Sequence, residues 1–116
     1  MADPIGYRRW AIAAGHLAET GDETACILNA TDDDAHVALT VFFPDRDPAG
    51  PYALTVPALR TRNVHFSELD EPEPIPRDTD YSSLIESDVP VVVQHSRFDS
   101  RQSDVALLST IAYAGD

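Results

Sequence analysis

The chain has 116 residues, of which 43 % are hydrophobic, so it is long enough for one domain over residues 1–116 and too apolar for a disordered chain. Its longest apolar stretches, VALTVFF and VPVVV, fall far short of the roughly 20 residues that a membrane-spanning helix needs, and MADPIGYRRW lacks a signal-peptide core, so we expect a cytoplasmic protein. The 20 acidic residues against 8 basic ones give a net charge of −12, which repels phosphate backbones and disfavours a DNA-binding regulator.

The first third of the chain shows three strand patterns. RRWAIAAG predicts a strand that ends at Gly15, and TACILNA predicts a second strand, followed by the turn formers TDDD. AHVALTVFF alternates strictly, with Val37, Leu39, Val41 and Phe43 on one side. Because successive side chains of a strand point to opposite faces, we expect this side to face the core.

The single cysteine, Cys26, lies inside the apolar run of the second predicted strand. It has no second cysteine with which to form an intrachain disulfide. The neighbouring sequence is not electropositive, as a reactive thiolate would require. We therefore expect Cys26 to be a small buried core residue.

The middle of the chain predicts two further strands and a long loop. YALTV places apolar residues on one face, whereas RTRNVHF is polar on both, as in an edge strand or an interface. The acidic, proline-rich segment SELDEPEPIPRDTDYSS predicts an ordered loop anchored by Ile75 and Tyr81. SSLIESD predicts one helical turn.

The last third contains a strand of unusual composition. VPVVV is apolar on both faces, as expected of a central strand, yet it runs directly into the polar stretch QHSRFDSRQ. DVALLSTIAYA predicts the final strand. About seven short strands, separated by Gly, Pro and Asp turns, predict an all-β fold, an antiparallel sandwich or barrel.

Catalytic and metal-binding signatures are missing from the sequence. It has no G-x-S-x-G, H-E-x-x-H or C-x-x-C motif and no glycine-rich phosphate loop, so we expect neither an enzyme nor a cofactor. The four histidines, His16, His36, His65 and His95, lack the paired spacing of a metal site, and the DDD turn lacks the spacing of a calcium loop. We therefore predict no metal site.

The polar stretch after VVV has two interpretations. In a strand, Gln94 and Ser96 point one way and His95 and Arg97 the other. The strand could simply end here, with Arg97 and Asp99 paired at the surface for less than about 1 kcal/mol. Alternatively, these donors and acceptors suit a polyhydroxyl ligand or a carboxylate. The residues alone favour neither interpretation.

Long blocks of the sequence closely resemble the sensory rhodopsin transducer family, small proteins associated with a cyanobacterial sensory rhodopsin. The similarity runs from about Trp10 to Ala114. The blocks are WAIAAGH, ETACILNATDDDAHVALTVFFPD, GPYALTVPALRTRNVHF, PIPRDTDYSSLIESDVPVVVQHSRFDSRQ and ALLSTIAYA.

The resemblance implies a fold, an assembly and a function. It implies an antiparallel β-sandwich, jelly-roll-like and of about seven or eight strands, that forms homotetramers and has no catalytic activity. It also implies binding to the cytoplasmic face of a sensory rhodopsin, a seven-helix retinal receptor, to relay its photosensory signal. Such a protein is cytoplasmic, or peripheral at the inner membrane through its receptor. The resemblance also implies kinship with small-molecule-binding β-domains, so carbohydrate binding without a rhodopsin partner is the alternative function.

Polar residues within these blocks are the expected ligand-binding or subunit-interface residues, and the sequence does not decide between the two roles. They are Glu23, Asn29, His36, Arg60, His65, Gln94, His95, Arg97, Asp99, Arg101 and Gln102. Trp10 is either core packing or a platform on which a sugar stacks, and packing is the commoner role of a lone tryptophan.

Overall fold

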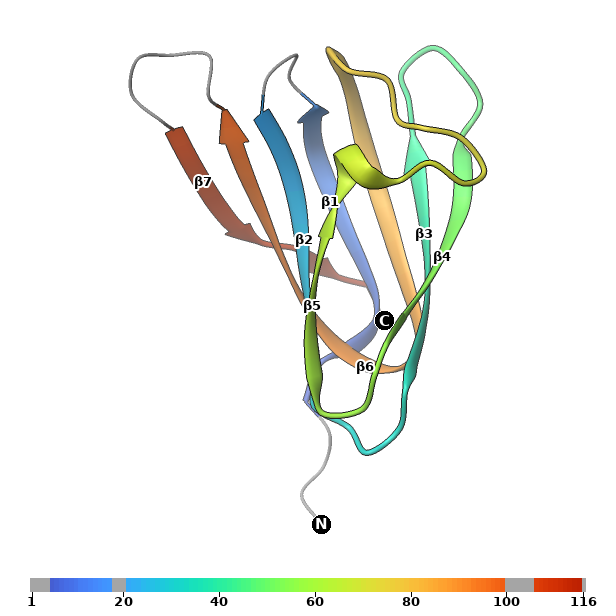
Figure 1. Ribbon diagram of the computed structural model, residues 1–116, viewed down its shortest axis with the longest axis vertical. Helices are drawn as coiled ribbons and strands as arrows, with labels where there is room; N and C mark the ends of the chain where they lie inside the picture. The colour runs from blue at the N-terminus through green and yellow to red at the C-terminus, as the bar shows by residue number, and fades with distance from the viewer. Residues whose placement is uncertain (1–4, 18–20, 100–105, 116) are drawn as a thin grey trace.

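Antiparallel strands form nearly all of the computed structural model, which describes residues 5–17, 21–99 and 106–115 (Figure 1). The strands are β1 (Tyr7–Leu17), β2 (Gly21–Asn29), β3 (Ala35–Phe42), β4 (Ala49–Val56), β5 (Arg60–His65), β6 (Thr79–Asp99), β7 (Ala106–Ile111) and β8 (Tyr113–Ala114). Within the described residues the helical content is one 3-10 turn, η1 (Phe66–Glu68), and no helix there has the length and apolarity to cross a membrane. The predicted all-β, antiparallel class is confirmed.

The long strand β6 belongs to both layers of the sandwich. Its first arm, 79–87, pairs with β1 and β3 in a sheet of order β4-β3-β6-β1-β8. Its second arm, 92–99, pairs with β2 and β7, and β5 lies beyond β2. In Figure 1, β6 descends from the upper end of the molecule, bends at the lower end and rises again beside β7. The upper end is therefore where the two arms are farthest apart.

Pro90 lies just before the point where β6 changes sheets, because Val91 still pairs with β1 and Val92 pairs with β2. The described register pairs of β6 stop at Ser87 and resume at Val91. Proline has no backbone N–H to donate to a ladder, so it is tolerated in a strand only where that donor is not needed. In VPVVV, the valines thus belong to the strand and the proline marks where the strand bends.

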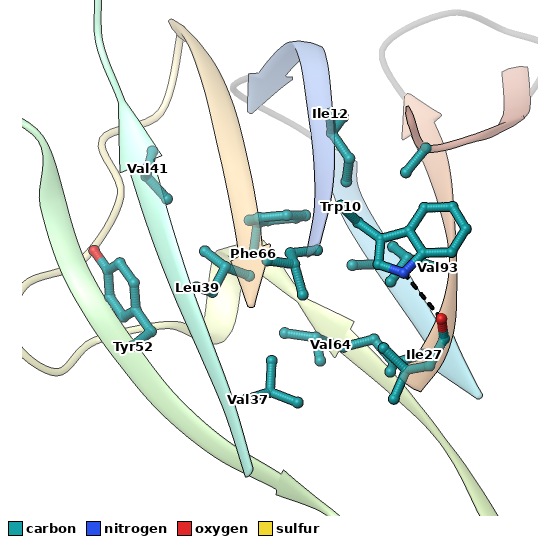
Figure 2. Close-up of a cluster of buried hydrophobic side chains, with 14 of the residues drawn as sticks. Trp10, Ile12, Ile27, Val37, Leu39, Val41, Tyr52, Val64, Phe66 and Val93 are labelled. Carbon is teal, nitrogen blue, oxygen red and sulfur yellow. Dashed lines mark hydrogen bonds between the residues drawn. The ribbon is translucent and has the colours of Figure 1, made fainter. Parts of the chain in front are cut away.

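The core lies between the two sheets and follows the predicted alternation. Val37, Leu39 and Val41 are buried on the inner side of β3, as the sequence predicts. Figure 2 shows them with Phe66 and Val93, which reach the same cluster from η1 and from the second arm of β6.

Trp10 is part of this core and not an exposed platform. Its side chain is only 4 % exposed. Its indole Nε1 donates to the carbonyl oxygens of Val91, at 2.9 Å, and Tyr7, at 3.0 Å (Figure 2). The indole thereby satisfies its polar atom while it packs beside the bend of β6.

The edge strand and one of the two loop anchors, Ile75, are also confirmed, whereas Tyr81 and the other residues 79–83 of the predicted loop belong to β6. Among the described pairings, β5 pairs only with β2, and most of its side chains are exposed. In the loop that leads to β6, Ile75 is 5 % exposed, and Tyr81 at the start of β6 is 3 % exposed. The Tyr52 hydroxyl donates to the carbonyl of Glu73 at 2.6 Å, which ties the loop to β4.

Several strand boundaries differ from the sequence prediction, and the segment predicted as one final strand contains both β7 and β8. Two further differences have a clear cause. SSLIESD is not a helical turn but part of the first arm of β6, because β1 and β3 pair with it on both sides. The first strand ends at Leu17, not Gly15, because β1 continues to pair with the start of β6 beyond Gly15. In both cases pairing between distant segments overrides the local pattern.

The prediction that Cys26 is a core residue is wrong. Ala25 and Ile27 occupy the inner side of β2, so Cys26 points to the outer side and is partly exposed. Leu28, on the same outer side, is 39 % exposed. The strict two-residue period of a strand decides which side chains are buried, even within an apolar run.

Trp10→Ala is expected to lower the free energy of unfolding by about 3–5 kcal/mol, because it empties a large volume in the core and leaves the Val91 carbonyl without its donor. Urea denaturation measures this change. Tyr113→Ala is the control, since Tyr113 is 74 % exposed, and it should shift the value by no more than about 0.5 kcal/mol. A loss below about 1 kcal/mol for Trp10→Ala would contradict the assignment of Trp10 to the core.

Candidate functional site

A cleft of about 660 Å³ opens at the upper end of the sandwich, and we refer to it as the terminal cleft. Side chains from the end of β1, the end of β3 and both arms of β6 surround it. Its lining residues are Ala13, Ala14, Gly15, His16, Phe42, Phe43, Pro44, Asp80, Tyr81, Ser82 and Arg97. The cleft thus combines an apolar wall with a small number of polar groups, as ligand pockets commonly do.

A buried carboxylate, that of Glu23, lies behind Arg97. Glu23 is 0 % exposed. Its Oε2 accepts a hydrogen bond from Arg97 Nε at 2.9 Å and lies 2.9 Å from His95 Nε2, while its Oε1 accepts from the backbone N–H of His16. We call Glu23, His95 and Arg97 the Glu23 network. It connects β2, the second arm of β6 and β1.

Strand register brings the Glu23 network together. Glu23 lies directly opposite Arg97, and Ala25 lies opposite His95. All of them are on the inner side of the sheet, because burial alternates along β2 and His95 follows Val91 and Val93 on the same side of β6. Directly opposed and diagonal side chains of paired strands are within contact distance, so one register brings both His95 and Arg97 to one carboxylate.

The surroundings of Glu23 keep it ionised. Burial raises the pKa of the Glu23 carboxyl, but the hydrogen bonds from His95 and Arg97, the adjacent Tyr81 hydroxyl and the charge of Arg97 outweigh it. The net result is a Glu23 pKa below its ordinary value. The carboxylate is therefore the negative partner of a hydrogen-bonded ion pair inside the sandwich.

Tyr81 lies next to the Glu23 network and belongs to the opposite sheet. Its side chain is 3 % exposed, and its hydroxyl is buried without a hydrogen-bond partner of normal geometry among the described residues. Burial and the nearby Glu23 charge both raise the pKa of Tyr81, so the hydroxyl keeps its proton. Gly15 packs against its ring, and a Cβ there would lie 2.8 Å from a ring carbon, so glycine is required at this point.

Two histidine–carboxylate pairs border the network. His16 Nδ1 lies 2.7 Å from Asp80 Oδ1 at the rim of the terminal cleft. His65 Nδ1 lies 2.8 Å from Asp22 Oδ2, and Asp22 Oδ1 accepts from the backbone N–H of Glu23 at 2.8 Å. Asp22 therefore couples β5 to the start of β2, next to the buried carboxylate.

The structure separates the expected site residues into groups. Glu23, His95 and Arg97 meet at the terminal cleft, and His65 reaches their neighbourhood through Asp22. Gln94 lies on the exposed side of β6, as alternation predicts. The side chain of Asp99 and residues Arg101 and Gln102 lie outside the described part of the structure.

Three expected site residues lie elsewhere and have local partners. Asn29 is fully buried, and its amide donates to the carbonyl oxygens of Asp33 and Val56, so it holds a turn together. Arg60 is exposed and donates to the carbonyl oxygen of the preceding residue. His36 is exposed, and its hydrogen bond to Asp88 raises the pKa of His36.

Sequence reasoning missed Tyr81, His16 and Asp80 as members of the cleft. Tyr81 was expected only as a loop anchor, and His16 only as a possible metal ligand. Alternation along the first arm of β6 would place Tyr81 on the inner side, but only the packing of the two sheets brings it to Glu23. No group of three or more His, Cys, Asp or Glu side chains in the described ranges is arranged to hold a metal ion.

Comparison with known proteins identifies close relatives. The family model of the Anabaena sensory rhodopsin transducer matches residues 5–114. The solved structure of the Anabaena sensory rhodopsin transducer is 54 % identical, with a TM-score of 0.77 over 81 % of this chain and 99 % of that chain. Thermotoga maritima protein 1070 is 28 % identical, with a TM-score of 0.87 over 95 % and 96 % of the two chains. No curated protein sequence matches.

Glu23→Gln is expected to lower the free energy of unfolding by about 2–4 kcal/mol. Breaking a buried ion pair costs about 3–5 kcal/mol, and the smaller value reflects the 35 % exposure of the Arg97 side chain. Chemical denaturation at pH 7 measures the loss. Glu86→Gln is the matched control, because Glu86 pairs with Arg9 at the surface, and it should change stability by no more than about 0.5 kcal/mol. Equal effects of the two substitutions would contradict a buried ion pair.

The stability difference between the wild type and Glu23→Gln is expected to depend on pH. A carboxyl whose pKa is lowered by folding stabilises the protein above its unfolded value, near 4.5, and loses this contribution as the pH falls through its folded pKa. The difference should therefore be largest at neutral pH and shrink below pH 4.5. Denaturation of both proteins from pH 7 to acid pH measures it, and a difference that grows on acidification would show that Glu23 is protonated in the folded state.

Proposed function

Since the chain belongs to the Anabaena sensory rhodopsin transducer family, we propose that it binds the cytoplasmic face of a sensory rhodopsin and relays the receptor's light signal. The observation that carries this proposal is the family match over residues 5–114, together with 54 % identity to the Anabaena sensory rhodopsin transducer. In this role the chain is a cytoplasmic, non-enzymatic adaptor that reaches the membrane through its receptor.

The charge of the chain supports such docking. Its net charge is −12, and the cytoplasmic loops of membrane proteins carry an excess of Lys and Arg. Opposite charges accelerate the encounter of two proteins and favour one orientation. We further propose that the chain acts as a homotetramer, which would present the same acidic surface to receptors several times and raise the overall avidity.

Binding to membrane vesicles that contain Anabaena sensory rhodopsin tests this function. The protein is expected to co-sediment with these vesicles and not with receptor-free vesicles of the same lipids. Raising the salt from about 0.1 M to about 1 M shortens the Debye length from about 10 Å to about 3 Å, so binding should weaken at least several-fold. Absence of co-sedimentation at low salt would contradict the receptor function, and binding that does not respond to salt would contradict the electrostatic docking.

The terminal cleft supports a second function, the binding of a small molecule, of which a carbohydrate is the first candidate. Its volume of about 660 Å³ lies within the range of small-ligand sites. Phe42, which is 41 % exposed, provides an aromatic face at the wall of the cleft, and His16, Asp80 and Arg97 provide polar groups. Aromatic faces beside hydrogen-bonding groups suit hydroxylated ligands. Such a ligand could act with the receptor or without one.

A further inference from the structure

We propose that the ligand of the terminal cleft carries a carboxylate, which the guanidinium of Arg97 binds. This inference rests on the small-molecule function proposed above and specifies its ligand class as a hydroxylated organic acid, such as a sugar acid. It concerns this cleft alone and is independent of the receptor function.

The first argument is the orientation of Arg97. Its Nε donates to Glu23 at 2.9 Å, and its terminal nitrogens have no hydrogen-bond partner among the described residues. The side chain is 35 % exposed and lines the cleft. A guanidinium is a planar fork with five donors, of which Glu23 takes one. The remaining donors match the two oxygens of a carboxylate.

The second argument is the rigidity of this fork. Glu23 is fully buried and is held from three directions, by His95, by Arg97 and by the backbone N–H of His16. Because the carboxylate cannot move, the guanidinium that donates to it has a restricted orientation. Glu23 is therefore a positioning residue. Preorganised donors bind an anion better than mobile ones, because less freedom is lost on binding.

The third argument is the Tyr81 hydroxyl. It lies on a residue that lines the cleft and is buried beside the Glu23 carboxylate, which acts on it electrostatically, but no hydrogen bond of normal geometry joins the two. Native proteins satisfy nearly all buried polar groups, so a poorly bonded hydroxyl calls for an explanation. A ligand oxygen that displaces this weak contact with Glu23 would make Tyr81 a second donor beside Arg97.

The other charges of the cleft are compatible with an acid. Asp80 is the acidic residue of the lining, and its carboxylate is paired with His16 at 2.7 Å and is 79 % exposed at the rim. Glu23 carries the buried negative charge, which pairs with Arg97 and is hydrogen-bonded to His95. The remaining wall, with Phe42, Phe43 and Pro44, is apolar and would contact the carbon skeleton of the ligand.

Paired probes that differ in one carboxylate test the proposal by isothermal titration calorimetry and thermal unfolding at pH 7. The pairs are D-glucuronate with D-glucose, D-galacturonate with D-galactose, and D-gluconate with sorbitol. At least one acid is expected to bind ten or more times more tightly than its neutral partner and to raise the unfolding temperature. Arg97→Lys, which keeps the charge but loses the fork, should weaken this binding at least tenfold.

Tyr81→Phe separates a ligand contact from a structural one. Because this hydroxyl makes no hydrogen bond of normal geometry in the free protein, its removal should change the unfolding temperature little, yet weaken binding of the acid several-fold. Arg9→Lys and Tyr113→Phe are the matched controls, because both residues are exposed and neither lines the cleft. Both should bind the acid like the wild type.

The outcomes distinguish this inference from the function on which it rests. Equal binding of acid and neutral partner, unaffected by Arg97→Lys, would overturn the carboxylate proposal and leave small-molecule binding intact. Failure of every probe to bind at millimolar concentration would overturn both. Tight binding of an acid that survives Arg97→Lys and Tyr81→Phe would place the anion elsewhere and also overturn the proposal.

Discussion

The buried carboxylate of Glu23 is the interaction on which the upper end of the sandwich depends. An ion removed from water loses several kcal/mol of hydration, and attraction to a partner offsets this loss only when the geometry is good and the remaining lone pairs are satisfied. Here Arg97, His95 and the backbone N–H of His16 supply those partners. One charge thereby connects β2 and the second arm of β6 in one sheet to β1 in the other, at the end of the molecule where the two arms of β6 are farthest apart.

The two-armed strand β6 explains why this point is also a cleft. One layer contains the first arm and the other contains the second, and the arms diverge from the bend near Pro90 (Figure 1). Tyr81 and Arg97, which line the cleft, lie on different arms. A ligand bound to both would bridge the two layers.

Sequence patterns predicted most of the strands and part of the site. Strict alternation identified the inner side of β3, and the same rule placed His95 and Arg97 together on one side of β6. Two predictions failed. The apolar run around Cys26 suggested a buried side chain, but alternation places Cys26 on the outer side of β2. The segment SSLIESD suggested a helical turn, but its two neighbouring strands impose an extended conformation. Tyr81 and His16 could not be assigned to the site, because their proximity to Glu23 arises from the packing of one sheet on the other.

A carbon-13 NMR titration of the side-chain carboxyl carbon of Glu23 measures the ionisation state of this buried group directly. The resonance, assigned by its loss in Glu23→Gln, is expected to titrate with a midpoint below 4.5, because the hydrogen bonds and the charge of Arg97 outweigh burial. A midpoint above 4.5 would mean that burial prevails and that the carboxyl becomes protonated more readily than in water. Arg97 would then lack the fixed anion that orients its guanidinium towards the cleft.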